Sequence, residues 1–272
     1  MLRGYYAATS GMITQQRNQE MISNNLANAQ TPGFKADRSA TRSFPEMLLR
    51  QVGSTTVPTT NQLKFQQNRG IGSINTGVYQ QETIPFFEQG PIRETNIPTD
   101  MALVNGELPD ENGGLFYAVQ TEDEEVQYTR NGHFTVDGEG YLTTNEGLYV
   151  LDENEERIQT NDLEFNVTPE GIVQVDGDDF PLAVTYIEDV NELVKEGHDM
   201  FRLEEDGVAA LATESDTSFQ VVQGRLESSN VDVGRSMTDM IAAYRVFEQN
   251  QRVLRTYDES LGKAVSDIAR LG

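Results

Sequence analysis

Apolar side chains recur in alternating steps of three and four residues along the end of the chain, over residues 234–271. This spacing places them on one stripe of an α-helix, and it is typical of helices that pack the stripe against another helix. At a rise of about 1.5 Å per residue the helix would be roughly 55 Å long, longer than a small domain is wide. Gln251 and Asp258 are the polar interruptions of the stripe. Its apolar members are Met237, Met240, Tyr244, Phe247, Leu254, Leu261, Val265 and Ile268.

A second candidate for a long helix lies at the opposite end of the chain, over residues 3–28. The segment Thr31-Pro32-Gly33-Phe34 ends it, because proline prevents helical continuation and glycine permits the turn. Its stripe is more polar, so alone it would be a marginal helix in water. We therefore predict that the two terminal helices pair as a coiled coil. The apolar members of the N-terminal stripe are Leu2, Tyr5, Met12 and Leu26.

The segment after the first helix, residues 36–89, is rich in Gln, Thr, Ser, Asn and Gly. This composition predicts an extended connector with little core of its own. One apolar patch, residues 44–49, is expected to form one or two helical turns.

From about residue 90 to residue 225 the apolar period changes to two. Short apolar runs alternate with turn signals such as Asn131-Gly132 and Asn145-Glu146-Gly147, which predicts an antiparallel β domain, either a sandwich or a flattened barrel. No helix–strand alternation suggests a nucleotide-binding sheet. The expected fold class is therefore α+β: residues 1–35 with 226–272 form a helical assembly domain, 36–89 a connector, and 90–225 an acidic β-rich domain.

The formal net charge of the chain is −24, and it is distributed unevenly. Residues 100–216 contain about thirty acidic residues and four basic ones, so we expect the middle of the chain to face solvent and the ends to pack. Adaptation to a saline or alkaline habitat is an alternative cause of the acidity, and both causes can hold. The charge argues against nucleic-acid binding and against adhesion to an anionic membrane, because each needs a basic surface.

Several further features limit the classes of protein to which the chain can belong. The chain has no cysteine, which excludes disulfides, thiol catalysis and cysteine-bound metals. The N-terminus lacks the pattern of a cleaved secretory signal, and no apolar run is long enough to insert in a membrane. We expect that, if the chain leaves the cell, it uses a route that reads no cleaved signal.

Catalytic and metal-binding patterns are weak. The two histidines, His133 and His198, are far apart in sequence and are expected on the surface or at strand edges. The clusters Asp137-Gly138-Glu139 and Asp176-Gly177-Asp178-Asp179 contain oxygen ligands for calcium, but they lack the spacing of a known calcium loop and fit hairpin turns better. The chain has no tryptophan that could form a platform for a sugar ring. We therefore predict no enzymatic activity and no cofactor.

Two motif-bearing segments, one near each end of the chain, carry a resemblance. The first holds Ser-Gly-Met, Asn-Leu-Ala-Asn and Thr-Pro-Gly-Phe elements, and the second holds the element Gln-Gly-Arg-Leu-Glu-Ser-Ser-Asn-Val-Asp. Together they resemble the bacterial flagellar axial proteins of the rod and hook family. The motif residues are Ser10, Gly11, Met12, Asn24, Asn25, Leu26, Ala27, Asn28, Thr31, Pro32, Gly33, Phe34, Gln223, Gly224, Leu226, Glu227, Ser229, Asn230, Val231 and Asp232.

The interior resembles the family in the same order, with Tyr128-Thr129-Arg130-Asn131-Gly132-His133-Phe134 in its β region. Departures at Asn96-Ile97-Pro98-Thr99-Asp100 and Gly114-Leu115-Phe116-Tyr117 are typical of a divergent rod protein. The length suits a rod subunit better than a hook subunit, which usually carries further outer domains.

The resemblance implies an axial structural subunit of the flagellar basal body. Its partners would be other copies, further rod and hook subunits, and the flagellar export apparatus. The terminal helices would pair as an inner layer, and repeated heterologous contacts would build an open helical tube. A non-polymerising scaffold or binding module of the same fold is the alternative, and an acidic extracellular enzyme or calcium-binding β protein is a third possibility.

Overall fold

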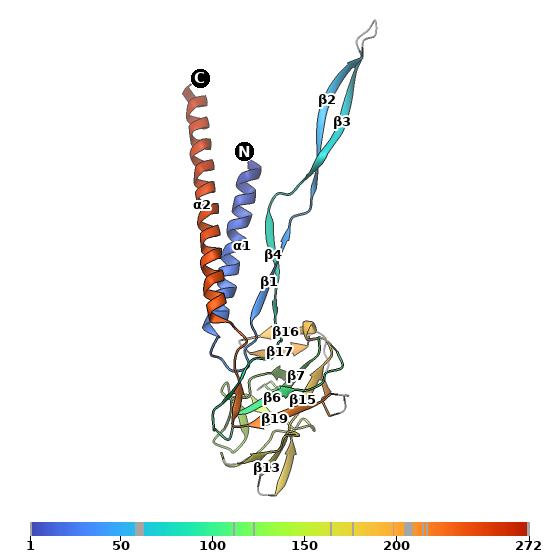
Figure 1. Ribbon diagram of the computed structural model, residues 1–272, viewed down its shortest axis with the longest axis vertical. Helices are drawn as coiled ribbons and strands as arrows, with labels where there is room; N and C mark the ends of the chain where they lie inside the picture. The colour runs from blue at the N-terminus through green and yellow to red at the C-terminus, as the bar shows by residue number, and fades with distance from the viewer. Residues whose placement is uncertain are drawn as a thin grey trace. The chain divides into compact units, whose positions relative to one another are not determined.

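The computed structural model describes residues 2–57, 63–110, 112–121, 123–163, 165–175, 177–197, 199–203, 209–213, 215 and 217–270, without the side chains of 2, 52–57 and 63–69. The chain forms two compact units. The helical unit consists of Met1–Ser23, Arg38–Thr83 and Met237–Gly272, and the β unit consists of Asn24–Asp37 and Ile84–Ser236. The elements of both units are labelled in Figure 1.

Two helices, α1 (Leu2–Ala27) and α2 (Val233–Arg270), pack together in opposite directions (Figure 1). Gly4 lies against Tyr257 and Gly11 lies against Asn250, which fixes the antiparallel pairing. The predicted pairing of the terminal helices is thereby confirmed. Neither described helix is long and apolar enough to cross a membrane.

The surface of α2 that is covered within the chain follows its own alternation of three and four residues. Ala243 is buried with only 4% of its surface exposed, and Gly4 and Gly11 of α1 leave room for the side chains of Tyr257 and Asn250. This stripe shares every second position with the one predicted from the apolar pattern. Its members, all buried or half-buried, are Met240, Ala243, Phe247, Asn250, Leu254, Tyr257, Leu261 and Ala264.

The residues that link α1 to α2 in sequence begin with two paired ribbons. Strand β1 (Asp37–Ser43) pairs with β4 (Val78–Pro85), and β2 (Met47–Val57) pairs with β3 (Leu63–Ile74) in an antiparallel register. The expected helical turns at residues 44–49 are wrong: 44–46 are irregular and 47–49 already belong to β2. Pairing with β3 satisfies the backbone groups that a helical turn would have satisfied internally.

The β1–β4 ribbon lies against α1. The Thr14 hydroxyl donates to the carbonyl of Val78 at 3.3 Å, and the Val78 N–H donates to the hydroxyl of Ser10 at 3.3 Å. Gly77 approaches Ser10 so closely that a β-carbon there would overlap its hydroxyl. Because Gly4 and Gly11 face α2 and Ser10 and Thr14 face the ribbon, α1 is contacted on two sides.

The β unit confirms the predicted antiparallel β domain. Its main sheet has the order β16-β17-β8-β7-β11-β10-β9, with β15 paired to both β7 and β18. Smaller sheets pair β12-β13-β14, β6-β19 and β5-β20. The strands are β5 (Ile92–Glu94), β6 (Met101–Asn105), β7 (Gly114–Gln120), β8 (Val126–Thr129), β9 (Phe134–Val136), β10 (Leu142–Thr144), β11 (Tyr149–Val150), β12 (Asn166–Val167), β13 (Ile172–Val175), β14 (Asp178–Pro181), β15 (Val184–Ile187), β16 (Leu193–Glu196), β17 (Met200–Leu203), β18 (Ala210–Leu211), β19 (Phe219–Gln223) and β20 (Arg225–Glu227), with the short 3-10 helix η1 at Val190–Glu192.

Strand β7 is buried on both faces and separates two apolar clusters. Tyr117 points into the larger cluster with Leu142 and Val173, whereas its neighbour Phe116 packs in the other cluster with Phe201. Successive side chains of a strand point to opposite faces, so one strand supplies both cores. Packing on both faces therefore holds the backbone of β7 in place, and the motif segments are built around it.

Candidate functional site

The two motif segments meet at a buried cluster of three charged side chains, Lys35, Arg130 and Glu227. Lys35 and Glu227 are 192 positions apart in sequence, yet their side chains form an ion pair at 2.6 Å. The Arg130 guanidinium forms a second ion pair with Glu227 at 2.6 Å. We call these three residues the ion cluster; their side chains are 1–4% exposed.

The hydrogen bonds of Arg130 are directed to the core strands. Its Nε donates to Glu227 Oε2, and Nη1 donates to the carbonyl of Leu115 at 2.6 Å. Nη2 donates to the carbonyl of Leu103 at 2.7 Å and to Oδ1 of Asn105 at 2.6 Å. A buried charge is tolerated only when its polar groups are hydrogen-bonded. These bonds therefore explain why an arginine can lie in the core of the β unit.

The other oxygen of Glu227 joins two further segments. Oε1 accepts from the Lys35 ammonium and from the N–H of Gly90 at 2.8 Å, and Lys35 also donates to the carbonyl of Glu88 at 3.0 Å. The carbonyl of Glu227 accepts from the N–H of Gly33 at 2.8 Å. One glutamate therefore holds the segment after α1, the segment before β5 and the core sheet together.

The electrostatics of the cluster balance burial against attraction. Burial alone would raise the pKa of Glu227, but the charges of Arg130 and Lys35 outweigh it and hold that pKa below its ordinary value. Burial lowers the pKa of Lys35, and the charge of Glu227 only partly opposes this effect. Glu227 is therefore the residue on which the two cations depend.

Two asparagines of the motifs fasten the segments beside the cluster. Asn25 makes a two-way contact with Asp37, donating to its carbonyl at 2.8 Å and accepting from its N–H at 2.9 Å. Asn230 accepts from the N–H of Ala36 at 2.7 Å and donates to the carbonyls of Phe86 and Glu88. A side-chain amide can donate and accept at once, and both asparagines use that property.

Glycine is required at two motif positions. Gly33 has a φ of +71°, and a β-carbon there would lie 2.5 Å from the backbone nitrogen of Asn131. Gly224 has a φ of +72°, donates to the carbonyl of Asp100, and accepts from the N–H groups of Thr95 and Asn96. Positive φ values of this size favour glycine, so both positions are conformational requirements.

The helix ends are capped by motif residues. The Asp232 carboxylate accepts from the N–H of Arg235 at 3.0 Å at the start of α2, as expected for an N-cap. At the end of α1, Asn28 donates to the carbonyl of Asn24, and Thr31 donates to the side-chain oxygen of Asn28. Both junctions are thus held by local hydrogen bonds as well as by the ion cluster.

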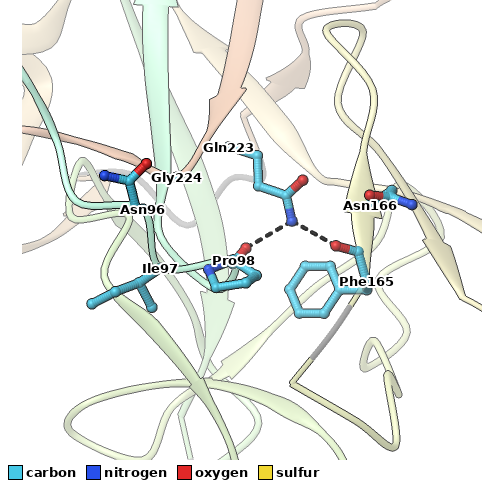
Figure 2. A pocket seen from close by; sticks show the side chains of 7 residues that line it. All are labelled: Asn96, Ile97, Pro98, Phe165, Asn166, Gln223 and Gly224. Carbon is cyan, nitrogen blue, oxygen red and sulfur yellow. Dashed lines mark hydrogen bonds between the residues drawn. The ribbon is translucent and has the colours of Figure 1, made fainter.

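An open cleft of about 500 Å³ lies beside the second motif, and Figure 2 shows its lining. The Gln223 amide donates to the carbonyls of Pro98 at 2.8 Å and Phe165 at 2.7 Å, and its oxygen accepts from the N–H of Val167. Gln223 therefore links the loop before β6 to the start of β12. The cleft is lined by Asn96, Ile97, Pro98, Phe165, Asn166, Gln223 and Gly224, none of which is ionisable.

A second hollow, of about 740 Å³, lies between α1 and α2 in the helical unit. Its α1 side is polar and its α2 side is apolar. Ile241 and Tyr244 line it while remaining 55% and 54% exposed. We call it the helical groove; its lining residues are Gln16, Gln19, Glu20, Ser23, Met240, Ile241 and Tyr244.

The predicted interface residues fall into two groups. Met240, Phe247, Leu254 and Leu261 are half-buried, whereas Met237, Tyr244, Val265 and Ile268 are 50–72% exposed. On α1, Tyr5 is 38% exposed and Met12 and Leu26 are half-buried, while the side chain of Leu2 lies outside the described residues. Their role in assembly stays a prediction.

The motif residues also separate by unit. Ser10 and Gly11 contact the ribbon and α2 within the helical unit. Met12, half-buried, also lies in the helical unit. The remaining motif residues belong to the β unit, where Phe34, Leu226 and Ser229 are buried, Pro32 and Val231 are half-buried, and Ala27 is exposed.

Sequence reasoning missed several residues that matter to these contacts. Lys35 directly follows the Thr31-Pro32-Gly33-Phe34 element and Arg130 stands within the quoted segment 128–134, but no sequence pattern predicts their ion pairs. Ala243 and Tyr257 on α2 were outside the apolar stripe. The offset of the contact stripe from the apolar stripe is visible only once Gly4 and Gly11 of α1 are placed against Tyr257 and Asn250.

The histidines and the acidic clusters were the weak candidates for catalysis or metal binding. His133 Nδ1 pairs with the buried carboxylate of Asp100 at 2.5 Å and is itself partly exposed, whereas His198 lies outside the described residues. The carboxylate of Asp137 accepts from the N–H groups of Glu139 and Tyr141, which is turn chemistry. Among the described residues no group of potential metal ligands gathers, and Asp176 lies outside them.

Comparisons with known proteins agree with the motifs. Family models match in three places: the C-terminal region of flagellar basal body rod FlgEFG proteins at residues 222–267, the D1 domain of flagellar hook proteins FlgE/F/G at 112–175, and the flagella basal body rod protein at 6–35.

Similar relatives cover at least 93% of the chain. The flagellar hook-basal body complex protein FlhO of Bacillus subtilis is 39% identical over all of both chains. The flagellar basal-body rod protein FlgG of Borreliella burgdorferi is 31% identical, covering 97% of this chain and 98% of that one. The FlgG protein of Caulobacter vibrioides is also 31% identical, over 93% and 95%.

Proposed function

The chain belongs to the family of flagellar basal-body rod and hook proteins, and we propose that it is an axial subunit of the rod that polymerises helically. This family is structural and non-enzymatic, and its place is the hook-basal body complex. In the assembled rod the subunit transmits torque and lines the export channel. Its partners are its own copies, neighbouring rod and hook subunits, and the flagellar export apparatus that delivers it.

The observation that carries this proposal is the incomplete burial of α2. Pairing with α1 covers one stripe, yet Met237, Ile241 and Tyr244 remain at least half exposed. Ile241 and Tyr244 also line the helical groove. Three large apolar side chains on consecutive turns form a continuous patch, and such a patch on a soluble chain marks a contact surface. We propose that helices of neighbouring copies cover it.

The ion cluster also supports the proposal, through contacts within the chain rather than through an exposed surface. The last residues of α1 and the first residues of α2 belong to the β unit, where the cluster and the two asparagines hold them. The bases of both helices are therefore fixed by interactions within the chain. We propose that residues 1–35 with 226–272 act as the assembly domain, that 36–89 connect it, and that 90–225 form the outer acidic domain.

The test is complementation of an in-frame deletion in the source bacterium, read out as swimming and basal-body composition. The full chain is expected to restore both, whereas a chain lacking residues 237–272 is expected to restore neither. Normal motility and complete basal bodies in the deletion strain would overturn the axial role.

A finer test uses substitutions that leave the chain folded. Ile241→Asp and Tyr244→Asp place a charge on the exposed side of α2 and are expected to block incorporation. Gln249→Asp, also exposed on α2, is the matched control and is expected to incorporate. Purified variants should show equal helix content, because none of the three side chains is buried.

A non-polymerising scaffold of the same fold is the second candidate, because α1 and α2 already cover each other within one chain. That candidate predicts that Ile241→Asp and Tyr244→Asp are harmless. Normal swimming with both variants, in a deletion strain that needs the full chain in order to swim, would favour it.

A further inference from the structure

The open cleft beside the second motif differs in charge from the unit that contains it (Figure 2). The β unit contains 8 basic and 36 acidic residues, a net charge of −28, yet none of the residues that line the cleft is ionisable. A lining without charge gives an ionic ligand no partner, and the carboxylates of the surrounding unit repel anions. The cleft therefore suits a neutral ligand.

Two asparagine side chains, Asn96 and Asn166, flank the cleft. Figure 2 shows them on opposite sides, with Pro98 and Gln223 between them. Both residues are exposed, and neither side chain has a hydrogen-bond partner among the residues that the structure describes. Each carboxamide carries two N–H donors and one acceptor oxygen. The cleft thus offers a ligand two unused sets of donors and acceptors.

The backbone holds both asparagines in place without a ligand. Asn96 has a φ of +58°, a conformation that asparagine tolerates better than most residues, and its N–H donates to the carbonyl of Gly224 at 3.0 Å. Asn166 belongs to β12 and lies directly opposite Gln174 of β13. Opposite residues share one face of a sheet, and Gln174 is also exposed without a described side-chain partner. A third carboxamide therefore lies next to Asn166.

The edge of β12 is closed to an added peptide strand. Strand addition needs free backbone groups along an edge. The Gln223 side chain already donates to the carbonyl of Phe165 and accepts from the N–H of Val167, the groups on either side of Asn166. A peptide strand finds these two groups occupied, whereas the carboxamides of Asn96 and Asn166 remain free. This favours a ligand that bonds side-chain amides through its own hydroxyl groups.

We propose that the cleft binds a short neutral oligosaccharide. The carboxamides of Asn96 and Asn166 exchange hydrogen bonds with sugar hydroxyls, each of which donates and accepts. Ile97, which is 45% exposed, and Pro98 contact the C–H face of a sugar ring. The volume of about 500 Å³ lies within the range of about 300–1,000 Å³ typical of small-ligand sites.

The proposed affinity is weak, because aliphatic side chains take the place of an aromatic platform. We expect a Kd of about 1 mM. All of the lining residues belong to the β unit, so the site does not depend on the proposed assembly into a rod.

The test uses the purified full chain and two neutral trisaccharides, chitotriose and maltotriose. Saturation-transfer difference NMR detects contact between protein and sugar protons, and titration gives the Kd. Transfer to either sugar with a Kd of about 1 mM is expected. Raising the salt from about 0.05 to about 0.5 M should change this Kd by less than about twofold, because neither the cleft nor the ligand is charged.

Two substitutions remove the carboxamides while preserving the backbone. Asn96→Gly suits the positive φ, and Asn166→Ala shortens an exposed side chain. Each is expected to raise the Kd at least about fivefold, and together they should abolish binding. The matched controls are Asn161→Gly, at an exposed position with a φ of +55°, and Asn145→Ala in an exposed turn, both outside the lining. They should leave the Kd within about twofold, and all variants should show the circular dichroism spectrum of the parent chain.

Several outcomes would overturn the proposal. No transfer to either trisaccharide at about 10 mM would remove the site. Equal losses in the control variants would show that the cleft asparagines are not the binding groups. Equally tight binding of trigalacturonic acid would reject the argument from charge, and tighter binding of the uncharged peptide acetyl-tetraalanine amide would assign the cleft to a peptide.

Discussion

Substituting Glu227 by glutamine tests the importance of the ion cluster. The change keeps the shape of the side chain but removes the charge that Lys35 and Arg130 share, leaving two buried cations without a counter-charge. Breaking a buried ion pair by removing one partner costs about 3–5 kcal/mol. For a unit of this size that corresponds to a fall in melting temperature of about 6–20 °C.

The matched control is Glu196→Gln in the same unit. Glu196 also pairs with an arginine, Arg202, at 2.9 Å, but both side chains are more than a third exposed. Solvent and salt screen such a pair, so the control should lose no more than about 1 kcal/mol. Thermal unfolding of purified chains, followed by circular dichroism of the β unit, measures both variants.

The pH dependence of this deficit is also specified. With Glu227 removed, Lys35 can relieve its burial by losing a proton, since burial already lowers its pKa. Between a lowered folded pKa and the unfolded value near 10.4 the unfolded chain binds more protons, so stability rises with pH there. The Glu227→Gln deficit should therefore shrink from pH 7 toward pH 9, and adding Lys35→Met should recover part of it at pH 7. A melting temperature within about 2 °C of the Glu196→Gln control would refute the reasoning.

Three further outcomes are expected. Gly33→Ala should lower the free energy of unfolding by more than about 2 kcal/mol, because the new β-carbon would overlap the adjacent backbone at a positive φ. Gly147→Ala, in open space at φ +86°, should lower it by only about 1 kcal/mol. Denaturant titration of both variants compares the two losses. Gly4→Leu should lower the thermal midpoint of the helical signal at 222 nm by disrupting contact with α2, while Gly262→Leu, with nothing near it, should leave it unchanged or raise it. Gln223→Ala should lower the free energy of unfolding of the β unit by about 1–3 kcal/mol, because two carbonyls and one N–H lose their partner. A loss smaller than this range in denaturant titration would contradict the role assigned to Gln223.

The elements with strong periodicity could be predicted from sequence. The three-and-four spacing identified both terminal helices, and the two-residue period with its turn signals identified the antiparallel β domain. Strands β1 to β4 could not, because two-stranded ribbons bury little and their composition of Gln, Thr and Gly resembles a connector. Hydrophobic patterning carries no signal where no face is buried.

The contact stripe of α2 shows a subtler limit. Two adjacent stripes share Met240, Phe247, Leu254 and Leu261, and the apolar pattern favours the one that adds Met237 and Tyr244. Within the chain α1 instead covers the stripe that adds Ala243 and Asn250, because Gly4 and Gly11 leave room for the side chains of Tyr257 and Asn250. Size complementarity between two helices cannot be derived from one of them alone.

The two stripes together are consistent with our proposal that the helices that stabilise the single chain also carry its assembly. Burial of Ala243 and its neighbours against α1, with the ion cluster at the helix bases, stabilises the single chain. Met237 and Tyr244, which belong only to the other stripe, are at least half exposed and are therefore accessible for the proposed contacts between copies. Substitutions at the ion cluster should consequently reduce the amount of folded chain, whereas substitutions at the exposed stripe should leave the chain folded and prevent its incorporation. Separating these two phenotypes by the position of the substitution distinguishes folding from assembly in a protein whose helices we propose to take part in both.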